Sequence, residues 1–576
     1  MSGLYEFQKR LTPHFLSKLR EAETKYLEDV NYLRKFSQQD WVQIELFYQR
    51  AVQDCDNDRM TLELCTDYPA CAPNLLTAVQ GPDDRIEWLE IAREAANRLE
   101  RFEIEVAHLG NLAMTYRNVG RMEEAILSFE QLCEALEDRE DVEEANALCM
   151  LGENYRVDGR YKEAIEAFER ALAVAKDQSY ILKSALYHNL GITSRNMGNI
   201  PLSVEHHETE RRIAEEENDP AGLARAYFSL GIASYEQLQV GKALKYHTEA
   251  LEITEREQFQ DSAQSVYVYH VSDNTGRAEL TYGVFTEGWQ KFFRLPIFMN
   301  RGIAETAIGR YEHALRSLDR ALKTAEDIGH KRFEAICWYR LGAIQYFLGK
   351  YEKALQYYKK SLALAEKDAK ARRAKGFALA GLGRIHLTRA YLDVSHNDLG
   401  FNELSEAFGI AIEIEEPRDI QEWGADLAEA YLYAGKLDDV QSTIDQVIEQ
   451  TDRHNIVENR YRVVALHGLI QARRGEQVKS VRSLLEEALA ITDELLAQTP
   501  DLFAAQYIRG LALSGLAILS KGNTRSTCLA QAQEAYRDAR KICDARGVIN
   551  DASRLLDALQ SLDPEDQLAP VRALLK

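Results

Sequence analysis

The sequence lacks the features that mark several large classes of protein. Only 11 of its 576 residues are proline, and no run of about 18 apolar residues occurs, so long linkers and a membrane span are not expected. The N-terminal segment has no apolar core of the kind that a signal peptide needs. The eight cysteines form no CxxC pair, which is typical of free thiols in a reducing compartment. These absences predict a cytoplasmic protein that does not bind a membrane.

An excess of positive charge and the common catalytic motifs are missing as well. The chain has 70 Lys and Arg against 92 Asp and Glu, a net charge of -22, which argues against general nucleic-acid binding. It contains no GxxxxGK[ST] phosphate loop, no GxSxG and no HExxH. The apolar fraction of 45% is nevertheless that of a folded soluble protein. We therefore expect a folded, non-catalytic protein without a cofactor.

What the sequence does contain is a repeat with a period of 39 or 40 residues. Small residues at 113, 152 and 191 are each followed seven residues later by Gly120, Gly159 or Gly198. Apolar residues recur at helical spacing on both sides of each glycine, so every unit predicts two antiparallel amphipathic helices joined at that glycine. One such pair cannot bury its apolar face alone, so neighbouring units must stack.

These positions resemble the tetratricopeptide repeat, in which Leu-Gly, Tyr, Gly, Ala, Phe and Ala stand at fixed offsets. The second unit supplies the pattern with Leu148, Leu151, Gly152, Tyr155, Gly159, Ala164, Phe168 and Ala171. The period is longer than the family's usual 34 residues. In this it is similar to the repeat arrays of bacterial signal-transduction (STAND-type) ATPases, which sense a ligand. The resemblance implies an all-α fold, a right-handed α-solenoid of about ten tetratricopeptide-like helical hairpins, with a concave groove lined by the first helix of each hairpin.

One stretch does not follow the helical pattern. In "SVYVYHVSDNTGRAELTYGVF", from Ser265 to Phe285, two β-branched and aromatic runs flank a polar break, which predicts a β-hairpin-like insertion near residues 262–289. The order of domains that we expect is a helical N-terminal cap with a degenerate repeat over 1–104, repeats over 105–260, the insertion with its hairpin and an aromatic helix over 261–294, further repeats over 295–545, and capping helices over 546–576.

Three arginines share one frame position, four residues after the small residue of consecutive units: Arg117, Arg156 and Arg195. The resemblance places this position in the groove. Asparagines occupy two further frames, namely Asn111 and Asn189, and Asn118 and Asn196. Guanidinium groups bind carboxylates bidentately and amides bind backbone groups, so these residues predict a site for an acidic or extended peptide. The alternative is that the arginines pair with nearby acids such as Glu153.

Aromatic residues make the insertion a second candidate interface, and those that would serve as anchors are Tyr267, Tyr269, Tyr282, Trp289 and Phe293. Three functions remain open. The leading one is a non-catalytic scaffold that binds a protein or peptide partner as a sensing or adaptor component of bacterial signalling or defence. The others are a regulatory subunit or enzyme with a site formed by the insertion, and a self-assembling structural protein that dimerises through it.

A histidine pair is the one feature that suggests a metal. His206 and Glu210 stand four residues apart on a predicted helix, with His207 beside them. Two ligands at helical spacing are too few for a metal site. His207 also falls on the core position that Phe129 and Phe168 occupy in earlier units. We therefore predict a packed histidine here and no metal.

Overall fold

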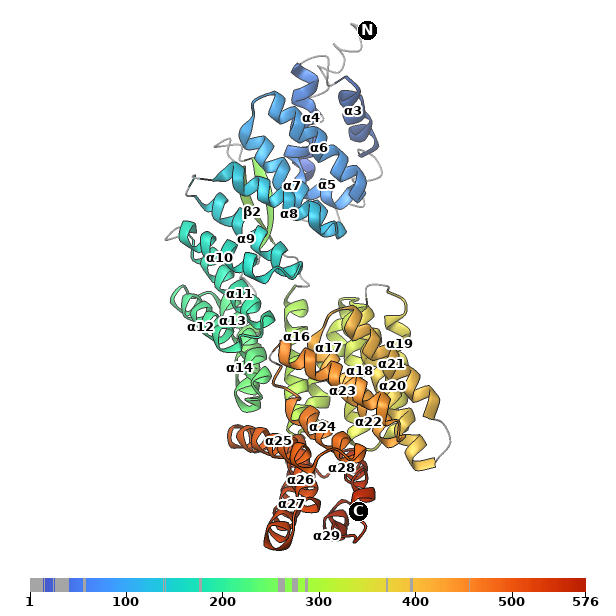
Figure 1. Ribbon diagram of the computed structural model, residues 1–576. Coiled ribbons are helices and arrows are strands. Elements are labelled where there is room, and N and C mark those ends of the chain that lie inside the picture. The colour runs from blue at the N-terminus through green and yellow to red at the C-terminus, as the bar shows by residue number, and fades with distance from the viewer. Residues whose placement is uncertain are drawn as a thin grey trace. The chain divides into compact units, whose positions relative to one another are not determined.

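The structure is a computed structural model (Figure 1). It describes residues 14, 16–23, 25, 41–54, 59–137, 139, 141–175, 179–256, 265–271, 278–284, 289–368, 371–393, 397–454 and 456–576. The chain forms two compact units. Unit 1 comprises Met1–Met197, Pro201–Ala226 and Glu257–Glu287, and unit 2 comprises Gly198–Ile200, Tyr227–Arg256 and Gly288–Lys576. No helix within the described residues is long and apolar enough to cross a membrane.

Unit 1 is built from successive helices joined by short turns. They are α3 (Trp41–Asp54), α4 (Arg59–Cys71), α5 (Pro73–Val79), α6 (Pro82–Arg98), α7 (Phe102–Val119), α8 (Met122–Leu136), α9 (Val142–Val157), α10 (Tyr161–Ala175), α11 (Tyr180–Asn196) and α12 (Ile200–Glu216), and α13 (Pro220–Glu236) begins in this unit and ends in unit 2. The turn between α7 and α8 is at Gly120, which adopts φ 81° and donates its N–H to the carbonyl of Arg117. A residue with a Cβ avoids this left-handed conformation, which is why glycine ends the first helix.

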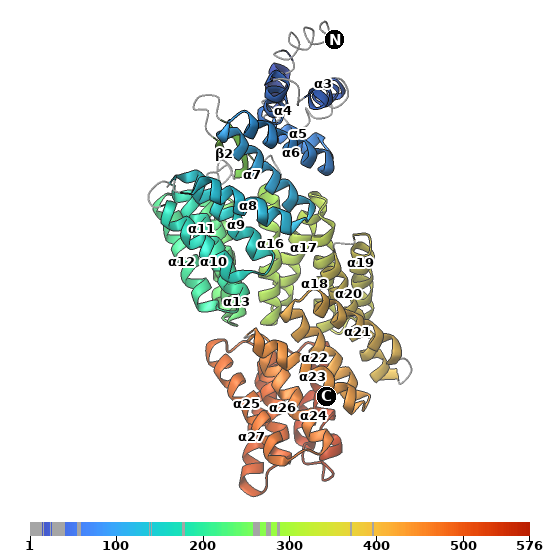
Figure 2. The ribbon, with the colours of Figure 1, turned by 45° about the horizontal axis from the view of Figure 1, so that its top comes forward.

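Unit 2 continues the same architecture. Its helices are α14 (Val240–Thr254), α16 (Trp289–Ala307), α17 (Tyr311–Asp327), α18 (Lys331–Phe347), α19 (Tyr351–Ala365), α20 (Arg372–Asp393), α21 (Asn397–Glu413), α22 (Pro417–Tyr433), α23 (Leu437–Arg453), α24 (Arg460–Arg474), α25 (Val478–Gln498), α26 (Phe503–Ile518), α27 (Gly522–Ile542), α28 (Arg546–Asp557) and α29 (Ala569–Arg572), with the short 3-10 helices η2 (Gln560–Leu562) and η3 (Ala573–Leu575). Within this unit α16 to α20 follow one another side by side (Figure 2).

The predicted all-α array of helical hairpins is confirmed. Positive φ recurs at the frame positions that the spacing marks as turns: Gly120, Gly159, Gly198, Leu238, Gly309, Gly349, Gly435 and Gly475. The small residue of a first helix lies against a large side chain of the second helix, sixteen residues later. A Cβ added to Gly152 would stand 2.6 Å from the ring of Phe168, and one added to Gly342 would stand 2.7 Å from the ring of Tyr358. The small residues therefore let the two helices of a hairpin pack in direct contact.

Two strands lie in unit 1 among these helices. β1 (Ser265–Val271) pairs antiparallel with β2 (Ala278–Val284), with Tyr267 opposite Tyr282. Both strands lie against α7, and β2 also lies against α9. The residues that connect the strands, and the side chains of Tyr267, Tyr269, Tyr282 and Trp289, lie outside the described residues. Phe293 belongs to the first turns of α16, since this helix begins at Trp289. Its side chain is half-buried against the core of unit 2.

The last helices of unit 2 pack back onto its earlier ones. The hydroxyl of Tyr346 in α18 donates to Asp551 Oδ1 in α28 over 2.7 Å, and Asn550 Nδ2 donates to the hydroxyl of Tyr351 over 2.8 Å. Between more distant segments, the Thr499 hydroxyl donates to the carbonyl of Leu238 over 2.5 Å. Contacts between segments far apart in the sequence therefore stabilise unit 2, in addition to the stacking of neighbouring hairpins.

Candidate functional site

The three arginines predicted for the groove lie near the C-terminal ends of the first helices α7, α9 and α11, and all are half-buried. Arg117 Nη1 is 3.0 Å from Glu153 Oε2, and Asn189 Nδ2 donates to Glu153 Oε1 over 3.2 Å. The pairing with Glu153, which the sequence left open as an alternative, is therefore present for Arg117. It connects two of the predicted groove residues through a single carboxylate.

Arg156 is in a different situation from Arg117. Its Nε is buried and has no hydrogen-bond partner among the described residues. Burial lowers the pKa of Arg156, and the positive charges of Arg117 and Arg195 lower it further, whereas Glu153 opposes the change. The arginines are thus close enough to repel one another, and this part of unit 1 carries a local positive charge.

The predicted asparagines do not form one surface. Asn111 and Asn189 are buried, Asn196 is half-buried and Asn118 is exposed. The strands lie against α7 and α9, the helices that carry Arg117 and Arg156. The three arginines are half-buried on α7, α9 and α11, so the predicted residues differ in burial from one frame to the next.

The first helices of unit 2 line a cavity of about 470 Å³. Some of its lining residues occupy the same position in their repeats as residues that were predicted to line the groove in unit 1. Asn300, Arg340 and Asp426 stand two residues before the small residue of their repeats, as Asn111 and Asn189 do in unit 1. The frame found in the sequence therefore identifies positions that face a cavity, although the arginines selected from it lie in the other unit.

Most charges around this cavity are paired. Arg373 binds Asp419 through two contacts of 2.7 and 3.0 Å, and Arg462 Nη2 lies 2.6 Å from both Asp426 Oδ1 and Glu429 Oε1. Burial raises the pKa of Asp419 to about 6 against the opposing charge of Arg373. These arginine–carboxylate pairs hold the first helices together and determine the shape of the cavity wall.

Two charged groups of the lining differ from the rest. No described residue forms an ion pair with Arg340 or with Glu422. The Arg340 guanidinium lies over the rings of Tyr339 and Phe377, 5.2 and 5.0 Å from their centroids, and its Nε is buried without a hydrogen-bond partner. The buried hydroxyl of Tyr433 also has none within the described part of the chain. Arg340, Glu422 and Tyr433 thus line the cavity, and these groups of theirs have no partner among the described residues.

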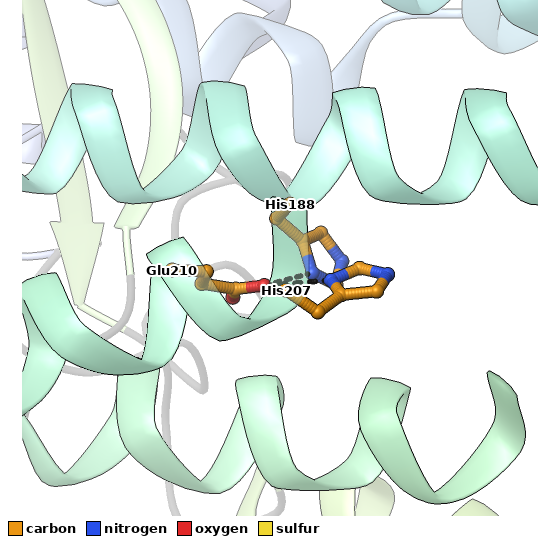
Figure 3. A group of neighbouring side chains, drawn as sticks. All are labelled: His188, His207 and Glu210. Carbon is orange, nitrogen blue, oxygen red and sulfur yellow. Dashed lines mark hydrogen bonds and ion pairs between the residues drawn. The ribbon is translucent and has the colours of Figure 1, made fainter. Parts of the chain in front are cut away.

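A separate cluster lies in unit 1, where His188, His207 and Glu210 converge (Figure 3). Glu210 Oε2 is 3.1 Å from His188 Nδ1 and 3.0 Å from His207 Nδ1. His207 is 1% exposed and packs on Gly191, so the prediction of a packed histidine at this position is confirmed. His206, which the spacing had placed with Glu210, instead has its ring beside that of Tyr187, at 6.2 Å.

Comparison with known families explains the frame. Residues 103–177, 182–256 and 294–367 match the tetratricopeptide repeat family. The chain contains tetratricopeptide repeats. No curated protein sequence matches it.

Several solved structures share similarity with these tetratricopeptide repeats. "Rap Protein Complexed with Competence and Sporulation Factor" is 16% identical with a TM-score of 0.44, over 68% of this chain and 99% of that one. "Rap conjugation gene regulator of the plasmid pLS20 in complex with the Phr* peptide" is 14% identical with a TM-score of 0.41, over 69% and 97%. BtubC from P. vanneervenii is 18% identical with a TM-score of 0.34, over 44% and 93%.

Two candidate site residues, Arg340 and His188, were not predicted from the sequence. The tetratricopeptide frame carries a signal for Arg340, because it occupies the position of Asn111 and Asn189 in a later repeat. His188 lies three residues before Gly191, a position held by Cys149 in the preceding repeat and Phe228 in the following one. Aligning the repeats by their small residues would have shown both substitutions.

Proposed function

We propose that this chain is a non-catalytic scaffold that binds an extended, acidic segment of a protein or peptide through the first helices of its tetratricopeptide repeats. The observation that carries the proposal is Arg340, a cavity-lining guanidinium with no acidic partner among the described residues. In a cavity whose other arginines are mostly paired, this group is the one that gains most from an incoming carboxylate.

The geometry around Arg340 suits a carboxylate ligand. Tyr339 and Phe377 contact the face of the guanidinium, which leaves the N–H edge as the direction from which an acid can bind bidentately. Glu422, also unpaired within the described residues, would accept from a cationic or N–H group of the same ligand. The volume of about 470 Å³ lies in the range of pockets that hold small ligands or a few peptide side chains.

The arginine row of unit 1 is a second, separate candidate for the acid-binding site. Arg156, with its buried and unbonded Nε, would meet an acidic side chain directly, and Arg117 would have to exchange Glu153 for it. Arg195 would add to the local positive charge. The resemblance to ligand-sensing arrays leads us to propose a sensing or adaptor role in bacterial signalling or defence, in the cytoplasm.

Affinity capture tests the proposal. The full-length chain would be immobilised, its partner captured from extracts of its own cells and identified by mass spectrometry, and overlapping peptides of that partner measured by fluorescence polarisation. Arg340→Gln is expected to weaken binding of the acidic peptide by roughly 10- to 150-fold, since a hydrogen bond to a charged group contributes about 1.5–3 kcal/mol. Arg316→Gln is the matched control, because Arg316 is exposed on the second helix α17.

The variants also locate the site. If Arg340→Gln binds as the unchanged chain does and Arg156→Gln does not, the peptide binds the row in unit 1. If both variants bind normally, neither arginine site receives the acid, and the proposed function is wrong in its chemistry.

A further inference from the structure

The cluster of His188, His207 and Glu210 has the composition of a metal site. Each residue offers one ligand atom, and these atoms lie within 4.8 Å of one another. His188 comes from the first helix α11, and His207 and Glu210 come from the second helix α12 of the same repeat (Figure 3). The three side chains converge between the two helices, which supply ligands from both sides.

Neighbouring repeats show what these positions normally hold. The equivalents of His188, His207 and Glu210 in the preceding repeat are Cys149, Phe168 and Ala171, and in the following repeat they are Phe228, His247 and Ala250. The acid is therefore a replacement of alanine, and it occurs in the repeat where both other positions are histidine.

His247 is a natural comparison for His207. It packs against Gly231 as His207 packs against Gly191, and neither of its ring nitrogens has a hydrogen-bond partner within the described chain. A histidine at this core position thus needs no carboxylate beside it. Packing alone explains His207 but explains neither Glu210 nor His188.

A second layer of contacts fixes the orientation of the carboxylate. Arg225 Nε donates to Glu210 Oε1 over 2.6 Å, and Arg225 Nη2 donates to the Ser184 hydroxyl over 2.9 Å. Because Oε1 is occupied, Oε2 is the oxygen that faces the two imidazoles. Such outer contacts are typical of metal sites, where they orient the ligands and tune them.

Among the three proposed ligands, only His188 is reached by solvent to an appreciable extent. Glu210 is fully buried and His207 nearly so, whereas the side chain of His188 is 20% exposed. An ion entering past His188 would exchange most of its water for protein ligands and keep some at the open side.

We propose that His188 Nδ1, His207 Nδ1 and Glu210 Oε2 bind a divalent transition-metal ion of the Zn²⁺ type, with water as the fourth ligand. Two imidazoles and one carboxylate form a ligand set that Zn²⁺ takes in proteins, with bonds of about 2.0–2.2 Å. Tetrahedral bonds of that length separate the ligand atoms by about 3.3 Å. The observed separations of 3.1 and 3.0 Å between Glu210 Oε2 and the two Nδ1 atoms need only a small expansion, and all three ligand atoms lie within 4.8 Å of one another. The ion replaces the two Nδ1 protons, and each imidazole then carries its proton on Nε2.

The test is metal binding by the full-length chain. The protein would be treated with a chelator, dialysed and titrated with Co²⁺, whose visible spectrum reports a four-coordinate site, and Zn²⁺ would then be added as competitor. We expect one such Co²⁺ per chain, displaced by Zn²⁺, and a melting temperature that rises with Zn²⁺ concentration.

The variants take their residues from neighbouring repeats, so that each is already accepted at its position. His188→Phe and His207→Phe are expected to weaken binding at least about 100-fold, since each removes a ligand and loss of an outer contact alone costs about 10- to 100-fold. His247→Phe removes a histidine from the equivalent position of the next repeat and is expected to leave Co²⁺ binding unchanged.

Circular dichroism would verify the fold of each variant. If His207→Phe does not fold, His188→Phe decides the question, because His188 is only half-buried. Absence of a four-coordinate Co²⁺ spectrum in the unchanged protein, or an identical spectrum and affinity in His188→Phe, would overturn the proposal and leave a hydrogen-bonded cluster only.

Discussion

Three glycines of unit 2 should respond to the same substitution in three different ways. Gly342 lies against Tyr358, and a Cβ there would stand 2.7 Å from the ring. Gly435 adopts φ 70° with open space around its Cα, and Gly409 lies in α21 with nothing within 4 Å of an added Cβ. Replacing each by alanine therefore separates helix contact, backbone strain and helix propensity.

The magnitudes follow from these environments. The Tyr358 ring cannot move away from a new methyl group at Gly342, since Gly381 contacts it as well and would place a Cβ 2.5 Å from it. Overpacking costs about 1–3 kcal/mol, and about 2–3 kcal/mol applies where the ring cannot move away. The gain in helix propensity offsets about 1 kcal/mol, so Gly342→Ala should cost ~1–2 kcal/mol. Gly435→Ala should cost ~1 kcal/mol, because the left-handed conformation is unfavourable with a Cβ. Gly409→Ala should instead stabilise by ~0.5–1 kcal/mol.

Calorimetry and urea denaturation of the three full-length variants would measure the order. Gly409→Ala should unfold at the highest temperature, the unchanged protein next, and Gly435→Ala and Gly342→Ala below it, with equal helical content in all. A Gly342→Ala variant as stable as the unchanged protein would show that the two helices of this hairpin are not in direct contact, and the packing described for the repeats would be wrong.

Two further predictions concern charge and burial. Arg462→Met leaves the buried carboxylates of Asp426 and Glu429 without their closest cation. It should lower the free energy of unfolding, measured in urea titrations, by about 3–5 kcal/mol. The control Arg460→Met removes an exposed ion pair and should change this free energy by less than about 1 kcal/mol. Burial lowers the pKa of His247 to about 3, so below pH 6.5 the unfolded chain takes up a proton that the folded chain does not. Between pH 6.5 and about pH 3, that histidine therefore destabilises the fold by about 1.4 kcal/mol for each pH unit of acidification. His247→Phe should reduce this loss of stability, and an equal loss in both proteins would contradict the expectation.

Much of the fold could be predicted because it repeats. The recurring small residue and the glycine seven positions later encode one local requirement each, helix contact and a left-handed turn. The structure has both at Gly152 and Gly159. Even Leu238, which breaks the glycine pattern, takes φ 57° at the same frame position. Local rules of this kind are visible in a sequence because they act within one hairpin.

The candidate sites depend on contacts between hairpin helices and were harder to predict. Spacing alone paired Glu210 with His206, four residues away. His207 is the residue that faces the core, so Glu210, three residues further on, points inward beside it and His206 does not. The contact of Glu210 with His188 joins two helices and has no local signature. The pairing of Arg462 with Asp426 has none either, because it joins residues of different repeats.

The return of α28 onto α18 affects how unit 2 can be made. In an open array each repeat is stabilised by its neighbours, so folding can start anywhere and proceed along the chain. Here the bond between Tyr346 and Asp551 joins residues 205 positions apart, and its entropic cost is met only when the last helices are in place. During synthesis on the ribosome, the cavity of unit 2 would therefore form only after the C-terminal helices have been made. Unit 2 would unfold as a whole instead of fraying from one end.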